Sequence, residues 1–230
     1  MTILCVETST SVCSAALCKE GKPIKQCIHY EGSNHAQLLP LYVEELLAFA
    51  REQNLAIDAV ALSEGPGSYT GLRIGTSTAK GLCYGLNVPL IPVPTLDVLC
   101  EAAKEQSEIR EKLPAIRLVP MIDARRMEVY TTDENGKARA VVVENEESII
   151  AENSEVYYFG DGAEKCQAVF SRSNWHYLPN IVPEAQYVGS LAEKLMSDGQ
   201  SLKANEIAYY EPYYLKEFVA AQSHVKGLKS

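Results

Sequence analysis

Two short segments near the start of the chain carry residue types that suit phosphate binding. Residues 7–11 (Glu-Thr-Ser-Thr-Ser) form a hydroxyl-rich turn, and residues 65–75 form a glycine-rich turn that leads into a helical pattern. Turns of this kind offer backbone N–H groups, and a helix N-terminus favours anions. The candidate phosphate-binding residues here are Thr8, Ser9, Ser11, Gly65, Gly67 and Ser68. A polar hairpin loop and a tight strand-to-helix turn are the alternative interpretations.

Two acids later in the chain stand where strands are expected to end. Asp123 closes one apolar run, while Asp161 and Gly162 follow another. In a cleft these carboxylates could contact a ligand, although turn and capping roles are more common for such residues. The four histidines show no metal-ligand spacing, and there is no G-x-S-x-G motif. The sequence therefore predicts no catalytic residue and no metal site.

The elements that must position these residues follow one order, β-β-β-α-β-α-β-α, twice. The first series is predicted at residues 2–7, 13–19, 24–30, 34–53, 59–63, 69–86, 89–93 and 96–105. The second series is predicted at residues 117–123, 127–133, 138–144, 146–152, 156–159, 163–171, 175–177 and 187–198. In both series the first strand ends in an acid, and the fourth runs into a glycine-rich turn. This order indicates a duplication joined by a polar stretch at residues 104–112.

The helix predicted at residues 69–86 has small residues on two faces. The stripes are Gly71, Gly75 and Ala79 on one face and Ser77, Gly81 and Gly85 on the other. Each helical glycine costs about 1 kcal/mol relative to alanine, so close backbone approach on two sides is expected. One side should meet the sheet. The other should meet a helix, either in a homodimer or heterodimer or in the other half of this chain.

The composition limits the classes of protein to which the chain can belong. Its 230 residues are 47% hydrophobic, which excludes a disordered chain, and its net charge is −9. An acidic balance argues against a protein that holds a nucleic-acid backbone alone. Seven cysteines without Cys-x-x-Cys spacing, and no signal peptide or membrane-spanning run, predict a cytoplasmic protein without membrane contact.

The duplicated order resembles the actin, sugar-kinase and chaperone-ATPase superfamily, and within it the sequence is similar to the TsaB (YeaZ) family. The segments that carry this resemblance are residues 3–9, 65–81, 123–130, 160–162 and 212–216. The resemblance implies an α/β fold of two ribonuclease-H-like halves, each a mixed five-stranded sheet flanked by helices. The halves are expected at residues 1–108 and 109–211, with residues 212–230 packing back on the first half.

The resemblance also implies a function in making threonylcarbamoyladenosine next to the anticodon of tRNA. Members are non-catalytic dimerization subunits that bind the catalytic paralogue TsaD, joined by the small ATPase TsaE. Some form homodimers, and tRNA would be reached only through the complex. No cofactor is expected, although ATP or ADP at the complex interface stays open. The implied partner-contacting residues are His35, Leu39, Tyr42, Leu46, Thr70, Gly71, Ile74, Gly75 and Thr78.

One departure from the resemblance bears on catalysis. The catalytic paralogue carries a His-x-x-x-His metal pair on its first helix, whereas His35 is followed here by Leu39. One histidine does not make a metal site, which favours a non-catalytic subunit over the catalytic one. The main alternative is a free-standing nucleotide-dependent kinase or ATPase. It would use Glu7, the Gly160–Gly162 turn as nucleotide bed and Asp123 as base.

Overall fold

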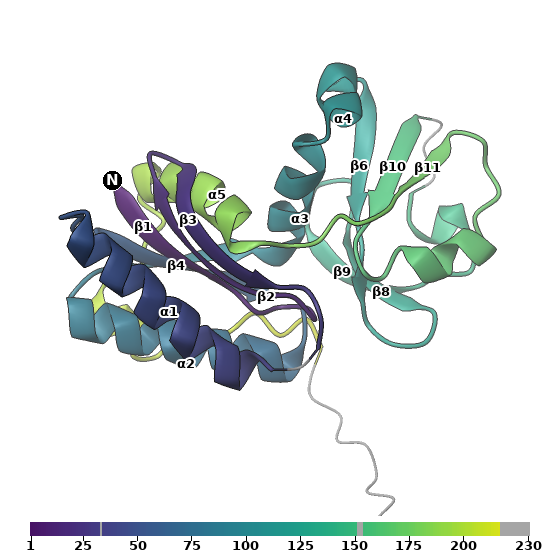
Figure 1. Cartoon of the computed structure of the whole chain (residues 1–230). Helices are drawn as coiled ribbons and strands as arrows, with labels where there is room; N and C mark the ends of the chain where they lie inside the picture. The colour runs from purple at the N-terminus through teal and green to yellow at the C-terminus, as the bar shows by residue number, and fades with distance from the viewer. Residues whose placement is uncertain (33, 151–153, 217–230) are drawn as a thin grey trace, which may run out of the picture.

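The computed structural model describes residues 1–32, 34–150 and 154–216 (Figure 1). The strands are β1 (Thr2–Glu7), β2 (Cys13–Lys19), β3 (Lys22–His29), β4 (Ala59–Gly65), β5 (Leu90–Pro94), β6 (Ile116–Pro120), β7 (Ile122–Asp123), β8 (Glu128–Thr132), β9 (Ala138–Val142), β10 (Glu155–Phe159) and β11 (Trp175–Leu178). The helices are α1 (His35–Glu52), α2 (Tyr69–Leu86), α3 (Thr95–Lys104), α4 (Ser107–Lys112), α5 (Ala185–Ser197) and α6 (Ala204–Ile207), with 3₁₀ turns η1 (Glu146–Ser148) and η2 (Glu164–Ala168). In the described part of the chain, no helix is long and apolar enough to cross a membrane.

The first half contains a mixed five-stranded sheet in the order β3-β2-β1-β4-β5. Strand β1 runs antiparallel to β2 and parallel to β4. Alternate residues of β1 point to opposite faces: Leu4 and Val6 pack with α1 and α2, while Ile3 and Cys5 pack with α5. The result is three layers, with α1 and α2 on one face and α5 on the other (Figure 1). The predicted α/β class is confirmed.

The second half departs from the predicted five-stranded sheet. Its strands form two three-stranded sheets, β11-β10-β6 and β7-β8-β9. The break lies after Pro120, which has no N–H to donate. The N–H and carbonyl of Met121 both bond on the β10 side, to Phe159 and Gly162, before the chain turns to pair with β8. If β6 and β7 are read as one interrupted strand, the order repeats that of the first sheet.

Helix α5 does not lie where the division of the chain at residue 108 would put it. Its buried residues Ala185, Val188 and Ala192 pack on Ile3 and Cys5 of the first sheet. Conversely, Leu99 of α3 packs with second-half residues. The assignment of this helix to the second half is therefore wrong. The boundary itself stays a prediction.

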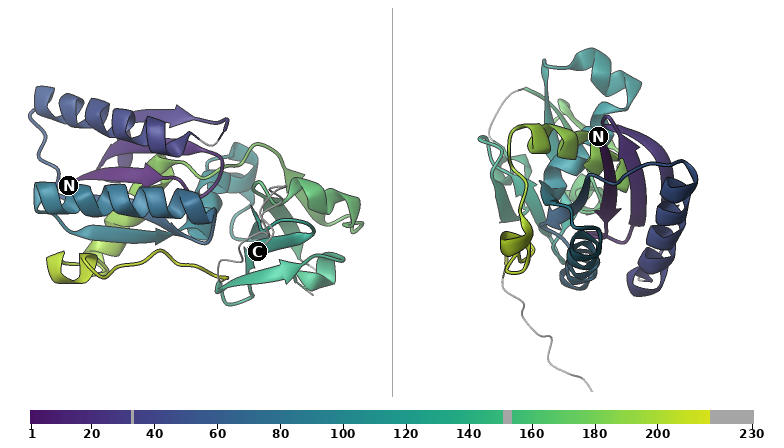
Figure 2. Two further views of the ribbon diagram at one scale, coloured as in Figure 1. Left: turned by 90° about the horizontal axis from the view of Figure 1, so that it is seen from below. Right: turned by 90° about the vertical axis from the view of Figure 1, so that its left-hand side faces the viewer.

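The other helices of the second half are shorter than predicted. The helix expected at residues 163–171 is the 3₁₀ turn η2, and that at 146–152 is η1, with residues 151–153 outside the described part. The expected polar junction instead contains α4. The C-terminal segment passes beside α2 toward the second half (Figure 2). Residues 217–230, also expected to pack on the first half, lie outside the described residues.

Candidate functional site

A cleft of about 660 Å³ opens between the two halves. It is bounded by the β1–β2 turn, the start of α2, the β7–β8 loop and the C-terminal residues 213–216, which we call the strap. Its lining residues are Ser9, Thr10, Ser11, His35, Pro66, Gly67, Ser68, Tyr69, Thr70, Gly71, Ile74, Ile122, Asp123, Ala124, Arg125, Tyr130, Asp161, Tyr213, Tyr214, Leu215 and Lys216. Most of the predicted phosphate-binding residues therefore lie together, although Thr8, Gly65 and Gly162 lie outside the lining.

The hydroxyl-rich turn is bonded within the protein. Thr8 Oγ1 donates to the carbonyl of Gly71 at 2.8 Å, and the N–H and hydroxyl of Ser9 donate to Glu7 Oε1 at 2.6 and 2.5 Å. The carbonyl of Ser9 accepts from the N–H of Ser68 at 2.6 Å. These groups join the turn to the start of α2. A phosphate would have to displace one of these bonds to reach Thr8 or Ser9.

Glu7 is the buried carboxylate that organises this turn. Its side chain is fully buried and also accepts a hydrogen bond from Ser63 on β4. Burial raises the pKa of Glu7, and the bonds from Ser63 and Ser9 oppose this by favouring the charged form. Glu7 therefore connects β1, β4 and the turn, which is a structural role that the sequence did not suggest.

The glycines of α2 fall into two classes. A Cβ at Gly71 or Gly75 would collide with Thr8, so these residues are small because the helix lies against the β1–β2 turn. A Cβ at Gly81 or Gly85 would meet nothing within 4 Å. The stripe expected to meet the sheet therefore does so. The second stripe faces open space in this chain.

The two predicted acids meet at the floor of the cleft. The N–H of Asp123 donates to Asp161 Oδ1 at 2.9 Å, and Asp123 Oδ1 accepts from the N–H of Arg125 at 3.3 Å. Lys165 forms an ion pair with Asp123 and donates to the carbonyl of Glu128 at 2.7 Å. Lys165 was not among the predicted site residues. It neutralises the acid assigned to the cleft.

The residues implied for partner contact are only partly accessible. Leu39 and Leu46 are fully buried in the core beneath α1, and His35 is buried with Nε2 2.9 Å from the carbonyl of Thr10. Gly71 and Gly75 are also buried. The expectation that these five contact a partner is corrected, because the chain's own sheet and turn cover them. Those that remain accessible are Tyr42, Thr70, Ile74 and Thr78.

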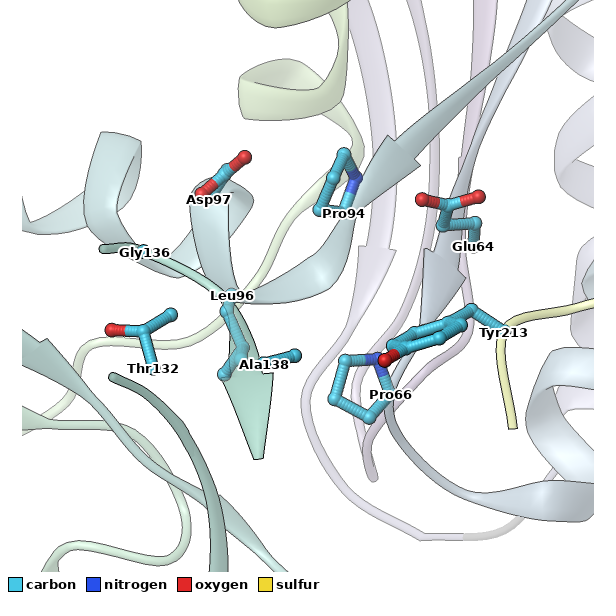
Figure 3. A pocket seen from close by; sticks show the side chains of 10 residues that line it. Glu64, Pro66, Pro94, Leu96, Asp97, Thr132, Gly136, Ala138 and Tyr213 are labelled. Carbon is cyan, nitrogen blue, oxygen red and sulfur yellow. The ribbon is translucent and has the colours of Figure 1, made fainter. Parts of the chain in front are cut away.

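A smaller cavity of about 200 Å³ lies beside the strap, between β4, α3 and the β8–β9 hairpin (Figure 3). It contains two carboxylates, Glu64 and Asp97. Burial, and then the charge of Asp97, raises the pKa of Glu64. Burial also raises the pKa of Asp97, and Lys104 opposes this. Sequence reasoning missed this pair because it meets only in the fold.

The structure adds cationic and aromatic residues that the sequence did not assign. Arg125 and Lys216 line the cleft, together with Tyr130 and Tyr214. The signals that could have found them are the consecutive arginines after Asp123 and the Tyr-Tyr-Leu-Lys strap. Among the described residues, no group of three or more His, Cys, Asp or Glu side chains could hold a metal ion.

The repeated strand order and the cleft between the halves define an α/β protein of the ribonuclease-H-like, actin-like type. A family model described as TsaD, tRNA N6-adenosine threonylcarbamoyltransferase, matches residues 31–220. The tRNA threonylcarbamoyladenosine biosynthesis protein TsaB of Haemophilus influenzae is 29% identical over 95% of both chains. The protein of that name from Escherichia coli is 28% identical over 96% of both.

A solved structure agrees with these relatives. YeaZ from Pseudomonas aeruginosa superposes with a TM-score of 0.74 at 28% identity, covering 93% of this chain and 99% of that one. The chain belongs to the family described by the TsaD model, in its TsaB (YeaZ) branch.

Proposed function

We propose that the chain is the non-catalytic dimerization subunit of a cytoplasmic complex that makes threonylcarbamoyladenosine in tRNA. In this proposal it binds and supports the catalytic paralogue TsaD, and the small ATPase TsaE joins the pair. Alone, the chain forms a homodimer through the same surface. The names of its relatives support the pathway, and its own residues support the subunit role.

The observation that carries the non-catalytic role is the state of α1. His35 bonds to the carbonyl of Thr10, and Leu39, one turn further, is fully buried in the core. Neither position offers a ligand to a metal at the cleft. A subunit built this way needs a partner to supply the reacting groups.

The surface we propose for the partner is the outer side of α2 and the adjoining side of α1. Thr70 is exposed, and Ile74 and Thr78 are half-buried on α2, while Tyr42 is half-buried on α1. The stripe of Gly81 and Gly85 continues this surface without a neighbour inside 4 Å. Small residues allow another helix to approach closely, which supports a helix-mediated contact.

Depletion of the protein followed by mass spectrometry of tRNA nucleosides tests the pathway. Loss of threonylcarbamoyladenosine is the expected result, because the catalytic partner would lack its supporting subunit. Re-expression of the wild-type chain should restore the nucleoside. Normal levels after depletion would exclude the pathway.

Charge at the proposed joint tests the partner surface. Ile74→Asp and, separately, Thr70→Arg should weaken binding to TsaD at least about tenfold, because an unpaired charge would be buried in the interface. Val142→Asp is the matched control, since Val142 is an exposed apolar residue of β9 in the second half. Isothermal calorimetry measures the affinities, and circular dichroism checks the folds. Full-strength binding by both folded variants would place the interface elsewhere.

A second candidate is a free-standing nucleotide-dependent kinase or ATPase. It is favoured by the cleft, which brings Asp123 and Asp161 together at its floor. Calorimetry of the isolated chain with ATP and magnesium separates the candidates. Submicromolar binding with turnover would replace the subunit proposal.

A further inference from the structure

We propose that the mouth of the cleft binds unpaired nucleotides of an RNA directly, through Arg73, Arg125 and Arg126 and the tyrosines beside them. This inference rests on the proposed function, which brings a tRNA to the complex. It replaces the expectation that the chain reaches tRNA only through its partner. The carrying observation is the state of the three guanidinium groups.

These three arginines differ from the others in the described residues. Carboxylates pair with Arg110 and Arg172. Backbone carbonyls accept from Arg51, Arg117 and Arg139. In the described part of the chain, the guanidinium groups of Arg73, Arg125 and Arg126 make no hydrogen bond or ion pair, although Arg73 lies 5.1 Å from the ring centre of Tyr69. A guanidinium left open in this way suits the two-pronged recognition of phosphate.

The arginines belong to one region. Arg125 lines the cleft, and Arg73 lies on α2 between the lining residues Thr70 and Ile74. Burial raises the pKa of Tyr214, and the charge of Arg73 lies close enough to oppose this. Burial likewise raises the pKa of Tyr130, where Lys216 and Arg125 act in opposition. Both walls of the cleft mouth therefore present cations toward the strap.

The neighbouring acids do not cancel this charge. Lys165 pairs with Asp123, and Lys216 pairs with Glu128 through both carboxylate oxygens at 2.7 Å. Asp161 is the lining carboxylate left without a cation among the described residues, and its Oδ1 accepts the N–H of Asp123. The cleft mouth is therefore locally positive in a chain of net charge −9. Such a local field attracts an anionic backbone even when the whole protein is acidic.

The backbone holds two of these arginines in an unusual conformation. Arg125 has φ 73° and Arg126 has φ 51°, in the left-handed region that residues with side chains seldom adopt. The loop is fixed by mutual bonds between the backbones of Ala124, Arg125 and Glu128, and Lys165 bonds the carbonyl of Glu128. Strain of this kind concentrates at functional sites. Its effect here is to keep both exposed side chains at the cleft mouth.

The cleft also offers aromatic faces for bases. Tyr69, Tyr130 and Tyr214 line it, and the rings of Tyr69 and Tyr214 lie 4.9 Å apart. Unpaired bases stack on such rings, whereas a double helix hides its bases. A volume of about 660 Å³ is that of a small-ligand pocket and suits a few unpaired nucleotides. The geometry therefore favours a single-stranded loop over a duplex.

Fluorescence anisotropy with the full chain tests this contact. The probes are a labelled RNA stem-loop with an unpaired loop, a blunt RNA duplex and ATP. We expect the stem-loop to bind more tightly than the duplex, with affinity that falls as salt rises. The double variant Arg125→Gly and Arg126→Gly should bind about tenfold more weakly and lose roughly two from the salt slope, one for each phosphate contact.

The variants are chosen so that folding does not decide the result. Glycine adopts positive φ readily, so the double glycine variant removes two side chains from a backbone that suits it. Arg125→Lys with Arg126→Lys should keep the salt slope while losing part of the affinity, because charge remains without the guanidinium fork. Arg110→Ala, which removes an exposed arginine from α4, is the control and should bind RNA as the wild type does.

Three results would overturn the inference. The first is no salt-dependent RNA binding by the full chain, and the second is an equal loss in Arg110→Ala. In the third, the double glycine variant loses ATP binding but keeps RNA binding, which would assign the arginines to a free nucleotide. The nucleoside measurement after depletion separates these failures from a failure of the proposed function. Loss of threonylcarbamoyladenosine without RNA binding would retain the function and exclude this contact.

Discussion

Glu7 illustrates what can and cannot be read from a single residue. The sequence identified an acid at the end of the first strand and an adjoining row of hydroxyls, and phosphate binding was one interpretation. The structure places that acid in the core, where Ser9 and Ser63 donate to it. Ser63 is 56 residues away along the chain, so the bond depends on the pairing of β1 with β4. No local pattern contains that information.

The carboxylate pair of the small cavity predicts a pH dependence. Because the pKa of folded Glu64 lies above its ordinary value of 4.5, the folded state binds this proton more tightly than the unfolded chain. The stability that this proton gives is therefore lost as the pH rises through the folded pKa toward neutrality. Glu64→Gln, which removes the charge facing Asp97, should raise the Tm at pH 7. The gain should vanish at acid pH, where wild-type Glu64 is also neutral.

Differential scanning fluorimetry from pH 4 to 8 measures this effect. Glu44→Gln serves as the control, because Glu44 is an exposed glutamate on the outer side of α1. Its Tm difference from the wild type should not follow the same curve. A Glu64→Gln variant that is less stable than the wild type at pH 7 would contradict the repulsion.

At the scale of elements, helix α2 shows why a surface is harder to predict than a helix. Its bounds follow from the sequence, and Ser68 precedes it as expected, accepting from the N–H of Gly71 at 3.4 Å. Helical spacing also identifies two small-residue faces. It does not say which face the β1–β2 turn will occupy. Leu39 and Leu46 were assigned to a partner for the same reason, since an apolar stripe looks alike whether its own sheet or another protein covers it.

The two faces of α2 predict opposite effects of one substitution. Gly81→Ala should stabilise the isolated chain by about 0.5–1 kcal/mol, because alanine is the better helix former and its Cβ meets nothing. Gly75→Ala should destabilise it by about 1–3 kcal/mol, because its Cβ would collide with Thr8. Urea unfolding followed by circular dichroism gives both values. Equal effects at the two positions would disprove the assignment of faces.

The first series of elements is predicted better than the second. Strands β1 and β2 and helix α2 have the predicted bounds, and the other elements of that series differ by one or two residues. In the second series the expected helix at 163–171 is a 3₁₀ turn, and the sheet breaks after Pro120. Periodicity reports which residues are buried but not against which sheet. The destination of α5 was therefore beyond the sequence.

For the whole molecule, net charge proved to be a coarse guide. A value of −9 suggested that nucleic acid would be held by another protein. The fold instead gathers Arg73 and Arg125, far apart in sequence, beside one cleft, while many of the acids lie elsewhere. Charge sums describe solubility and long-range attraction, whereas contact depends on local arrangement. That arrangement becomes visible only when the halves are placed together.

The packing of α5 on the first sheet has a consequence for how this protein can be dissected. A fragment cut near residue 108 would leave Ile3, Cys5 and Ala61 without their cover, because the helix that shields them comes from the far end of the chain. The complementary fragment would carry an apolar helix with no sheet to receive it. The two halves are thus interlocked by their own chain order. They were duplicated as units, but neither can now be inherited or expressed alone.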